Sequence, residues 1–424
     1  MKKFLSLVLA LVMTMSLVTV SAGAKDFSDS TKIQYKEAVD VMSAVNVISG
    51  YAEGDFRPTA TLTRGAAAKI ICNLILGPTT ASALVADAAP YSDVPTTHTF
   101  AGYIAYCQKE GIISGYADGT FRPANTLTGY AFMKMLLGAL GYDAEVEQYT
   151  GANWSINVAK RALNIGLDDD LVGDFNGIKA VNREEACLYA LNTLTADMVE
   201  YDAKTTVSTN GTTVVIAGSK AKEMVNNGNT DGKVFDKDGV MQFAEKYFDN
   251  LTVKTGSDDF ARPANVWKLK AEEIGTYTNS ADATYTAEVK ASTIYKDLGL
   301  GSNIAAKDVS VYEDGESQTA SAIVKGDDDT KFGANGVLTE VFYDDDADTV
   351  TITKVNTYIG SINKTVKATD KKDAYVVVTA EGPVPVQGFD NEFETDEKFE
   401  DDAYVLYTYS LTAKEIKSVE AAKK

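Results

Sequence analysis

Two arginines occupy positions at which a side chain can bind an anion. Arg64 follows Thr63, and Arg183 follows Asn182. Thr and Asn side chains commonly cap the N-terminus of a helix. A guanidinium group forms paired hydrogen bonds with a carboxylate, and the first turn of a helix adds N–H groups and a favourable dipole. Both arginines therefore combine the groups that can hold a carboxylate, with an intramolecular ion pair as the alternative for Arg64.

These arginines belong to predicted helix–loop–helix units. Before the first loop, apolar residues recur at helical spacing: Ala38, Val41, Met42 and Val45. Such spacing gives one face of a helix that can be buried. A Gly-rich loop then breaks the helix, and Thr63 precedes the second helix as its cap. Thr128 and Asn182 take the same place in two later units.

The loop between the helices occurs twice almost unchanged. Residues 50–58 recur as residues 115–123, an offset of 65. A weaker third copy, at an offset of 119, includes residues 173–175. Repeats of this length usually stack to share one core. The loop glycines, including Gly115 and Gly119, are expected to supply positive φ.

The repeated string resembles the S-layer homology family, whose signature is a Gly-Tyr-x-Asp-Gly-Thr-Phe-x-Pro loop followed by Thr-Arg-Ala-Glu at a helix start. The resemblance covers about residues 25–198, with two strong copies and one degraded copy. It implies an all-α-type threefold prism of three helix–loop–helix repeats, with grooves between neighbours. It also implies noncovalent binding of the secondary polysaccharide of a Gram-positive-type cell wall, often through a pyruvylated terminal sugar.

The resemblance further implies site residues. Asp29 and Asp93 match the family's Asp near the start of each unit, where a carboxylate accepts sugar hydroxyls or, alternatively, caps a turn. Trp154 matches a Trp at the start of a first helix, either as a sugar platform or as core. Gly129 replaces the Arg of the second unit, so that groove is expected to be weak, altered or empty. The predicted polysaccharide-binding residues are Arg64, Arg183, Asp29, Asp93, Trp154 and Thr63.

The net charge of the chain restricts the kinds of partner that it is expected to bind. The formal net charge is −20, from 60 acidic and 40 basic residues. This balance works against nucleic acid and anionic lipid, because phosphate binding needs clustered Lys and Arg. We predict neither a cofactor nor a metal site. Cys72, Cys107 and Cys187 are too few and too scattered for a disulfide framework, so buried thiols are expected.

Residues 1–24 are predicted to be a secretory signal peptide, with cleavage after Ala24. A basic start, an apolar run and a small-x-small site together indicate export. No later segment is apolar enough to span a bilayer. We therefore expect a secreted protein of the cell wall or surface layer.

From about residue 201 the composition favours antiparallel β structure, rich in Thr, Val and Tyr. Hairpins are predicted over residues 205–216, from residue 309 onward and over residues 336–355, and one helix over residues 239–248. The C-terminal half is therefore expected to be mainly β, as sandwich or small barrel modules. The predicted boundaries are 1–24 for the signal peptide, 25–83, 84–145 and 146–198 for the repeats, and 199–330 and 331–424 for two β modules.

The motifs favour a noncatalytic surface protein. No nucleophile elbow, zinc-protease motif or phosphate loop is present, and His98 is the sole histidine, which argues against a His-based triad. The principal hypothesis is a protein anchored to wall polysaccharide, with self-association in a surface layer as a second interaction. The alternatives are an anchored polysaccharide-acting enzyme with paired carboxylates in residues 201–424, and a scaffold whose repeats have lost their ligand.

Overall fold

The fold is that of a computed structural model, which describes residues 19–20, 27–202, 205–209, 212–216, 220–368, 373–395 and 397–422. Its contacts divide the chain into two compact units. The helical unit comprises Val20–Lys254 and Trp267–Gly275, and the β unit includes Thr255–Val266 and Thr276–Lys424. Apart from β1 (Thr19–Val20), the predicted signal peptide lies outside the described residues. In the described part of the chain, no helix has the length and apolarity needed to cross a membrane.

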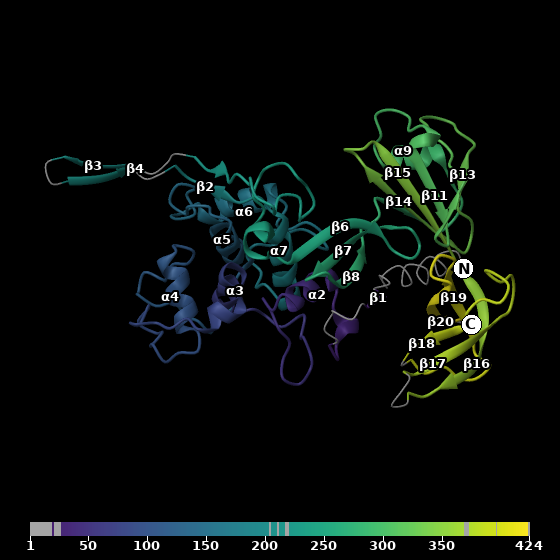
Figure 1. Cartoon of the computed structure of the whole chain (residues 1–424), viewed down its shortest axis with the longest axis horizontal. Helices are drawn as coiled ribbons and strands as arrows, with labels where there is room; N and C mark the ends of the chain where they lie inside the picture. The colour runs from purple at the N-terminus through teal and green to yellow at the C-terminus, as the bar shows by residue number, and fades with distance from the viewer. Residues whose placement is uncertain are drawn as a thin grey trace. The chain divides into compact units, whose positions relative to one another are not determined.

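Six helices of the helical unit form the predicted pairs (Figure 1). A short 3-10 helix, η1 (Ser30–Lys32), precedes them. The pairs are α2 (Lys36–Ala44) with α3 (Arg64–Ser82), α4 (Ala101–Lys109) with α5 (Gly129–Ala139), and α6 (Trp154–Asn164) with α7 (Arg183–Thr195). Within α3, Gly77 has a φ of 73°, so the helix is interrupted just before Pro78.

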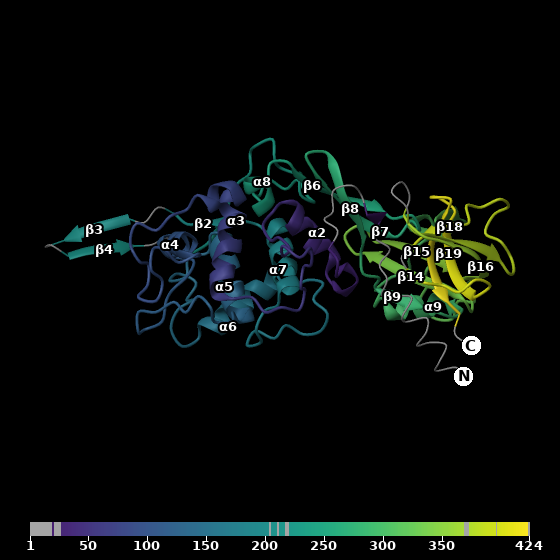
Figure 2. The same cartoon turned by 90° about the horizontal axis from the view of Figure 1, so that it is seen from below.

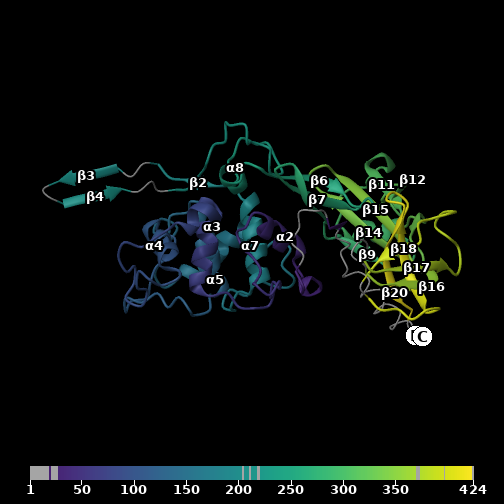
Figure 3. The same cartoon turned by 60° about the horizontal axis from the view of Figure 1, so that its bottom comes forward.

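The pairs interlock cyclically. The first helix of each pair packs on the second helix of another pair: α4 on α3, α6 on α5 and α2 on α7. Of the second helices, α5 packs on both α3 and α7, and the three are grouped together in Figures 2 and 3. No pair can therefore bury its apolar face alone, which confirms the expectation of a shared core in an all-α prism.

A ring of three main-chain hydrogen bonds lies where the pairs meet. The N–H of Leu62 donates to Val181 (2.8 Å), that of Val181 to Leu127 (2.9 Å), and that of Leu127 back to Leu62 (2.9 Å). Each of these residues lies just before the N-cap of a second helix. All three are apolar and buried. The ring ties the starts of the three second helices together with approximate threefold symmetry.

The predicted caps are present. The Thr63 hydroxyl accepts a hydrogen bond from Ala66 N at 3.2 Å, and Thr128 caps α5 in the same way. Asn182 accepts from the N–H of Glu185 at 2.8 Å, and the Glu185 carboxylate accepts from the N–H of Asn182. This reciprocal arrangement is a capping box, which satisfies two main-chain donors at once.

The helical unit continues into short β segments. These are β2 (Val199–Glu200) paired with β5 (Lys222–Glu223), and the hairpin β3 (Thr205–Thr209) with β4 (Thr212–Ile216). The hairpin confirms the prediction for residues 205–216, although its Asn210-Gly211 turn lies outside the described residues. Helix α8 (Phe243–Tyr247) lies within the predicted helical range 239–248. Strands β6 (Leu251–Ser257), β7 (Pro263–Leu269) and β8 (Glu272–Thr278) form a sheet in the order β1-β8-β7-β6.

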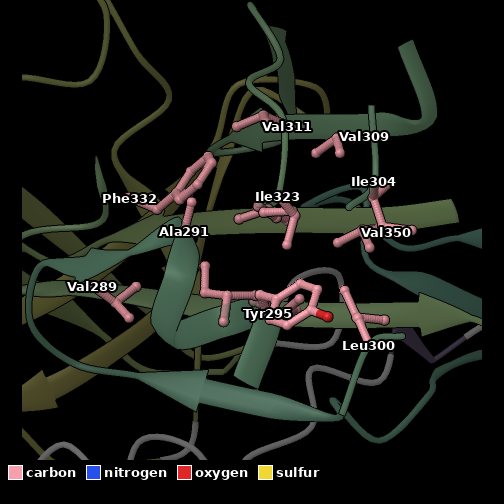
Figure 4. Close-up of a cluster of buried hydrophobic side chains, with 13 residues drawn as sticks. Val289, Ala291, Tyr295, Leu300, Ile304, Val309, Val311, Ile323, Phe332 and Val350 are labelled. Carbon is pink, nitrogen blue, oxygen red and sulfur yellow. The ribbon is translucent and has the colours of Figure 1, made fainter. Parts of the chain in front are cut away.

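The first β module has a five-stranded sheet in the order β12-β11-β15-β14-β9. Its strands are β9 (Ala283–Tyr285), β11 (Val309–Glu313), β12 (Glu316–Gln318), β14 (Val337–Asp344) and β15 (Thr349–Asn356). Strand β10 (Val289–Lys290) pairs with β13 (Lys331–Phe332), and α9 (Ala291–Asp297) and η2 (Ala306–Asp308) complete the module. Figure 4 shows the core that these elements enclose, including Tyr295, Ile323 and Val350.

One expectation for this module needs correction. Strand β11 pairs parallel with β15, whereas antiparallel structure was predicted throughout. The predicted hairpin β14–β15 is present and antiparallel. Because β11 and β15 lie on either side of residue 330 and share one sheet, we propose that the boundary between the β modules follows Asn356 in place of residue 330.

The last module is a second five-stranded sheet in the order β18-β17-β16-β19-β20. Its strands are β16 (Tyr358–Val366), β17 (Tyr375–Ala380), β18 (Glu392–Glu394), β19 (Tyr404–Ser410) and β20 (Glu415–Ala421). The edge strands β18 and β20 lie against each other, so the sheet nearly closes into a barrel. The C-terminal half is thus mainly β, as predicted.

Candidate functional site

The candidate site is a cavity of about 400 Å³ in the helical unit, which we call the Arg64 groove. All three helix pairs contribute to its wall. Arg64 comes from the start of α3, Tyr116 and Lys134 come from the second pair, and Trp154 begins α6. The lining residues that carry polar or aromatic groups are Arg64, Ser114, Tyr116, Phe121, Thr126, Thr128, Lys134, Tyr149, Thr150 and Trp154.

The loop of the second pair holds Arg64 in a fixed orientation. Its Nε donates to the carbonyl of Phe121 at 2.8 Å, and its Nη2 donates to the carbonyl of Ser114 at 3.3 Å. The guanidinium carbon lies 4.3 Å from the centre of the Phe121 ring and 5.2 Å from that of Tyr116. Among the described residues Nη1 has no hydrogen-bond partner, and no carboxylate pairs with Arg64. The alternative of an intramolecular ion pair is therefore not realised there.

Arg183 has equivalent surroundings on the loop of the first pair. Its Nε donates to Phe56 O and its Nη2 to Ser49 O, both at 2.8 Å. Its guanidinium lies 4.8 Å from the Tyr51 ring centre. Arg183 is thus related to Arg64 by the approximate threefold symmetry, but it does not line the Arg64 groove.

The helix N-termini differ from expectation, because their N–H groups are already engaged. In α3 the N–H of Arg64 donates to Asn125 O and that of Gly65 to Pro123 O, both at 2.9 Å. Thr63 receives the N–H of Ala66. The helix start therefore has no N–H to offer a ligand carboxylate, and an anion in this groove must be held by other groups of its lining.

Asp29 and Asp93 hold the repeated loops, residues 50–58 and 115–123, in place. The two carboxylate oxygens of Asp93 accept the N–H groups of Phe121 and Arg122, each at 2.7 Å. Asp29 does the same for Phe56 and Arg57, at 2.7 and 2.8 Å. Partial burial alone would raise the pKa of each carboxyl, but these hydrogen bonds lower both pKa values overall. Neither Asp lines the Arg64 groove.

Trp154 and Lys134 lie close together in the wall of the Arg64 groove. Lys134 Nζ lies 5.8 Å from the Trp154 ring centre, and the ring packs edge-on against Tyr130 with centroids 6.4 Å apart. Trp154 is only partly buried, so it is not a pure core residue. Of the predicted binding residues, the fold brings Arg64 and Trp154 to one cavity and leaves Thr63 as a cap beside it.

Sequence reasoning missed Lys134 as a site residue. Its signal is present in the repeats, because Lys69 stands 65 residues earlier at the same position of α3. Lys69 is exposed, whereas Lys134 is half-buried. Burial, and then the nearby charge of Arg64, lowers the pKa of the Lys134 ammonium. Burial likewise lowers the pKa of Arg64.

The groove is cationic within an acidic protein. Its lining includes Arg64 and Lys134 and no Asp or Glu, although the chain carries 60 acidic residues. Holding two cations together in a partly buried site is costly unless an anion joins them. The aromatic rings beside them offer flat apolar faces. The arrangement is suited to an anionic ligand that also has an apolar face, such as an acidic sugar.

The side of the prism at Gly129 lacks this chemistry. Gly129 donates its N–H to Lys179 O at 3.0 Å, so the main chain follows the same pattern as at Arg64. No guanidinium extends from this position, and Tyr130 packs instead against Phe175 with ring centroids 5.9 Å apart. The structure therefore has no arginine at the position of the predicted weak groove that corresponds to Arg64.

Comparisons with known proteins agree with these observations. The S-layer homology domain model matches residues 26–68 and 90–129. The surface layer protein of Brevibacillus choshinensis is 30% identical over 148 residues, which cover 34% of this chain and 13% of the relative. The middle cell wall protein of Brevibacillus brevis is 24% identical over 204 residues, covering 47% of this chain and 19% of the relative.

An endoglucanase of Bacillus sp. strain KSM-635 is also similar, with 25% identity over 200 residues that cover 44% of this chain and 21% of the enzyme. The chain thus spans about a fifth or less of the length of these relatives. The matched domains and the surface-layer and cell-wall relatives indicate a secreted protein of the cell surface. The chain carries S-layer homology domains and is a protein of the bacterial cell surface and cell wall.

Proposed function

We propose that the helical unit binds a cell-wall polysaccharide noncovalently, and that the Arg64 groove holds an acidic group of its sugar, such as a pyruvyl ketal. The observation that carries this proposal is the charge of the groove, which contains the cations of Arg64 and Lys134 and no carboxylate. In a chain of net charge −20, such a site attracts an anion against the general field of the protein.

The fixed guanidinium supports recognition of a carboxylate. Because Nε and one N–H of Nη2 are held by the loop carbonyls, Nη1 and the remaining N–H of Nη2 face the ligand. A guanidinium that is already oriented loses little side-chain entropy when it binds. Lys134 adds a second cation. Together they form a clamp for one carboxylate.

The aromatic residues support recognition of the sugar ring. Trp154 is partly buried and lies in the groove wall beside Lys134. The apolar faces of a pyranose pack on aromatic rings, while polar groups of Ser114, Thr126 and Thr128 lie nearby for its hydroxyls. We infer that the sugar ring packs on the ring of Trp154 and that Thr126 and Thr128 orient the sugar through its hydroxyl groups.

We further propose that the third pair is a degenerate S-layer homology repeat and that Arg183 marks a second binding position. The repeats then span about residues 25–83, 84–145 and 146–198. The shared arginine contacts support this assignment, since Arg183 repeats the two carbonyl contacts of Arg64. The Gly129 side lacks the arginine that corresponds to Arg64 and is expected to contribute little affinity.

A noncatalytic role for the β unit is supported by how its buried carboxylates are used. Asp258 and Glu340 both pair with Arg262, at 2.6 and 3.3 Å. Asp314 accepts hydrogen bonds from Asn356 and Tyr358. A glycosidase needs one carboxylate poised as acid and another free to act as base or nucleophile. These groups serve as structural partners, and we propose that the β unit mediates surface contacts, including self-association.

The alternative is a wall-anchored enzyme acting on polysaccharide, which the similarity to an endoglucanase favours. The two functions make different predictions for purified full-length protein. An enzyme would release reducing sugar from soluble glucans, and a noncatalytic anchor would release none.

Cosedimentation with purified cell walls tests the anchoring proposal. We expect the full chain to pellet with intact walls, and to stay in solution when mild acid has stripped the secondary polymer. Arg64→Ala and Arg183→Ala should each weaken binding by about tenfold or more, because a charge-assisted hydrogen bond contributes roughly 1.5–3 kcal/mol. Unchanged binding to stripped walls, or in the double variant, would refute the proposal.

A further inference from the structure

Two of the three cysteines lie in contact across the interface between the first and second helix pairs. Cys72 belongs to α3 and Cys107 to α4, and their Sγ atoms are 3.6 Å apart. Both side chains are fully buried. Their remaining contacts are main-chain carbonyls: Cys72 Sγ lies 3.5 Å from Tyr103 O, and Cys107 Sγ lies 3.7 Å from Ala68 O.

The contact is close to bonding geometry. A disulfide has an S–S length of about 2.05 Å, so the sulfurs need to approach by about 1.5 Å. Rotation of the two side chains supplies such a movement when the helices are already packed together, as α3 and α4 are. Cys187 offers an internal comparison, because it is equally buried in α7 and contacts neither of the other thiols among the described residues.

The location of the protein favours oxidation. Disulfides persist outside the cell, whereas cytosolic thiols are kept reduced. The S-layer homology domains and the surface-layer relatives indicate a protein of the cell surface. A thiol pair in contact is therefore exposed, over the life of the protein, to an environment in which the disulfide is the stable form.

We propose that Cys72 and Cys107 form a disulfide that covalently ties the first helix pair to the second. In the reaction two S–H bonds are lost and one S–S bond forms. The oxidant is a small external disulfide, which accepts the two electrons and two protons and leaves as two thiols. This inference goes beyond the proposed polysaccharide binding and does not depend on it.

The burial of the two thiols determines when the disulfide can form. The mutual contact, and then burial, raises the pKa of the Cys107 thiol well above its ordinary value. Because the thiolate is the species that exchanges with a disulfide, exchange in the fully folded protein is slow. The bond therefore forms while the chain folds outside the cell, or during openings that separate α3 from α4.

The structural consequence lies near the Arg64 groove. Residues 72 and 107 are 35 positions apart, so the link closes a loop that contains the end of α3 and all of the chain leading to α4. Closing a loop of this length restricts the unfolded chain and stabilises the folded one. The same two helix pairs supply Arg64, Tyr116 and Lys134 to the groove, so their relative position is reinforced.

Peptide mapping of the full chain tests the proposal. The protein is refolded with a mixture of reduced and oxidised glutathione, its free thiols are blocked with iodoacetamide under denaturing conditions, and it is digested without reduction. We expect a linked peptide pair containing Cys72 and Cys107, with Cys187 carrying the alkyl label. Alkylation of all three cysteines, or a link that involves Cys187 or a second chain, would overturn the proposal.

Thermal unfolding supplies a second readout. The oxidised protein should unfold about 5–15 °C higher than the same protein treated with a phosphine reductant. Cys107→Ala should abolish this redox difference, and the matched buried control Cys187→Ala should keep it. A difference that survives Cys107→Ala, or none in the wild type, contradicts the disulfide. If Cys107→Ala does not fold, the wild-type peptide map still decides the question, and wall binding tests the Arg64 proposal separately.

Discussion

The starts of helices α3 and α5 have the same main-chain surroundings but different side chains at the first helical position. In both, the first two N–H groups donate to carbonyl oxygens of the loop in the following helix pair, and a Thr caps the helix. Helix α3 then carries Arg64 on the groove, whereas α5 carries Gly129. The prism is therefore assembled by caps and main-chain contacts that do not require the arginine.

This comparison separates folding from ligand binding. The side chain at the first helical position can vary because the N–H groups are satisfied by the neighbouring loop. At the start of α5, neighbouring residues occupy the space that a side chain at position 129 would need. A Cβ built on Gly129 would lie 3.1 Å from the Cα of Gly177 and 3.2 Å from the Phe175 ring. The absence of an arginine at this position is thus accompanied by close packing of Gly177 and Phe175 against Gly129.

The largest expected effect is on binding in the Arg64 groove. The double variant Arg64→Ala/Lys134→Ala removes both cations, and wall affinity should fall by about 100-fold or more, since each charged contact contributes roughly 1.5–3 kcal/mol. Cosedimentation over a range of protein concentrations measures the loss. The control is Lys160→Ala, which removes an exposed cation of α6 outside the groove. Equal losses in the control and the double variant would mean that net charge alone controls binding.

Gly129→Arg tests whether an arginine at the start of α5 is enough to create a second binding site there. The close approach of Gly177 and Phe175 means that the new side chain must displace its neighbours, at a cost of about 1–3 kcal/mol in unfolding free energy. Wall affinity should stay within about twofold of the wild type. Urea denaturation and cosedimentation measure the two quantities. A gain of tenfold in affinity would show that the missing cation alone distinguishes the two sides.

Trp154→Phe probes the aromatic wall of the groove. Phenylalanine keeps a flat ring but loses area, so affinity for the wall polymer should fall by about two- to tenfold. Titration with wall fragments measures the change. The matched control is Phe100→Leu, since Phe100 precedes α4 as the equivalent residue of the second pair and does not line the groove. If both substitutions weaken binding equally, the ring has a packing role only.

The smallest expected effect concerns the loops. Asp93→Asn removes one of two accepting oxygens, so the helical unit should lose about 1 kcal/mol of unfolding free energy at pH 7. The folded pKa of Asp93 lies below its ordinary value of 3.8. Its stabilising contribution is therefore present above about pH 4 and is lost as the pH falls through the lowered pKa. The difference in urea midpoint between wild type and variant should therefore be smaller at pH 3 than at pH 7, and a difference of the same size at both pH values would exclude ionisation of Asp93 as its source.

Much of the helical unit was predictable because its signals are local. The caps Thr63, Thr128 and Asn182 mark helix starts from their side chains alone. The position of Arg64 at a helix start could be predicted for the same reason, and its role as an anion ligand stays a prediction. One loop glycine, Gly119, has the predicted positive φ of 81°, whereas Gly115 does not. A Cβ at Gly115 would lie 2.3 Å from the Tyr91 ring, so that glycine serves close packing.

The rest depends on contacts between distant segments, which local patterns do not encode. The helix N–H groups donate to the loop of the next helix pair, which for Gly65 and Pro123 lies 58 residues along the chain. The role of Lys134 depends on α6 packing against α5, which brings Trp154 to the same wall. In the β unit, β11 pairs parallel with β15, although β12, β13 and β14 lie between them in the chain. Turn residues indicate only the pairing of strands that are adjacent in the sequence.

The most direct test of the account is a double-mutant cycle between Arg64 and the acidic group of the ligand. Isothermal titration compares wild type and Arg64→Ala, each with the wall oligosaccharide before and after removal of its carboxylate. The account predicts that either change alone weakens binding by about tenfold or more, and that the second change then has little further effect. Losses that are independent and multiply, or a neutral sugar that binds as tightly as the acidic one, would contradict a contact between Arg64 and a wall carboxylate.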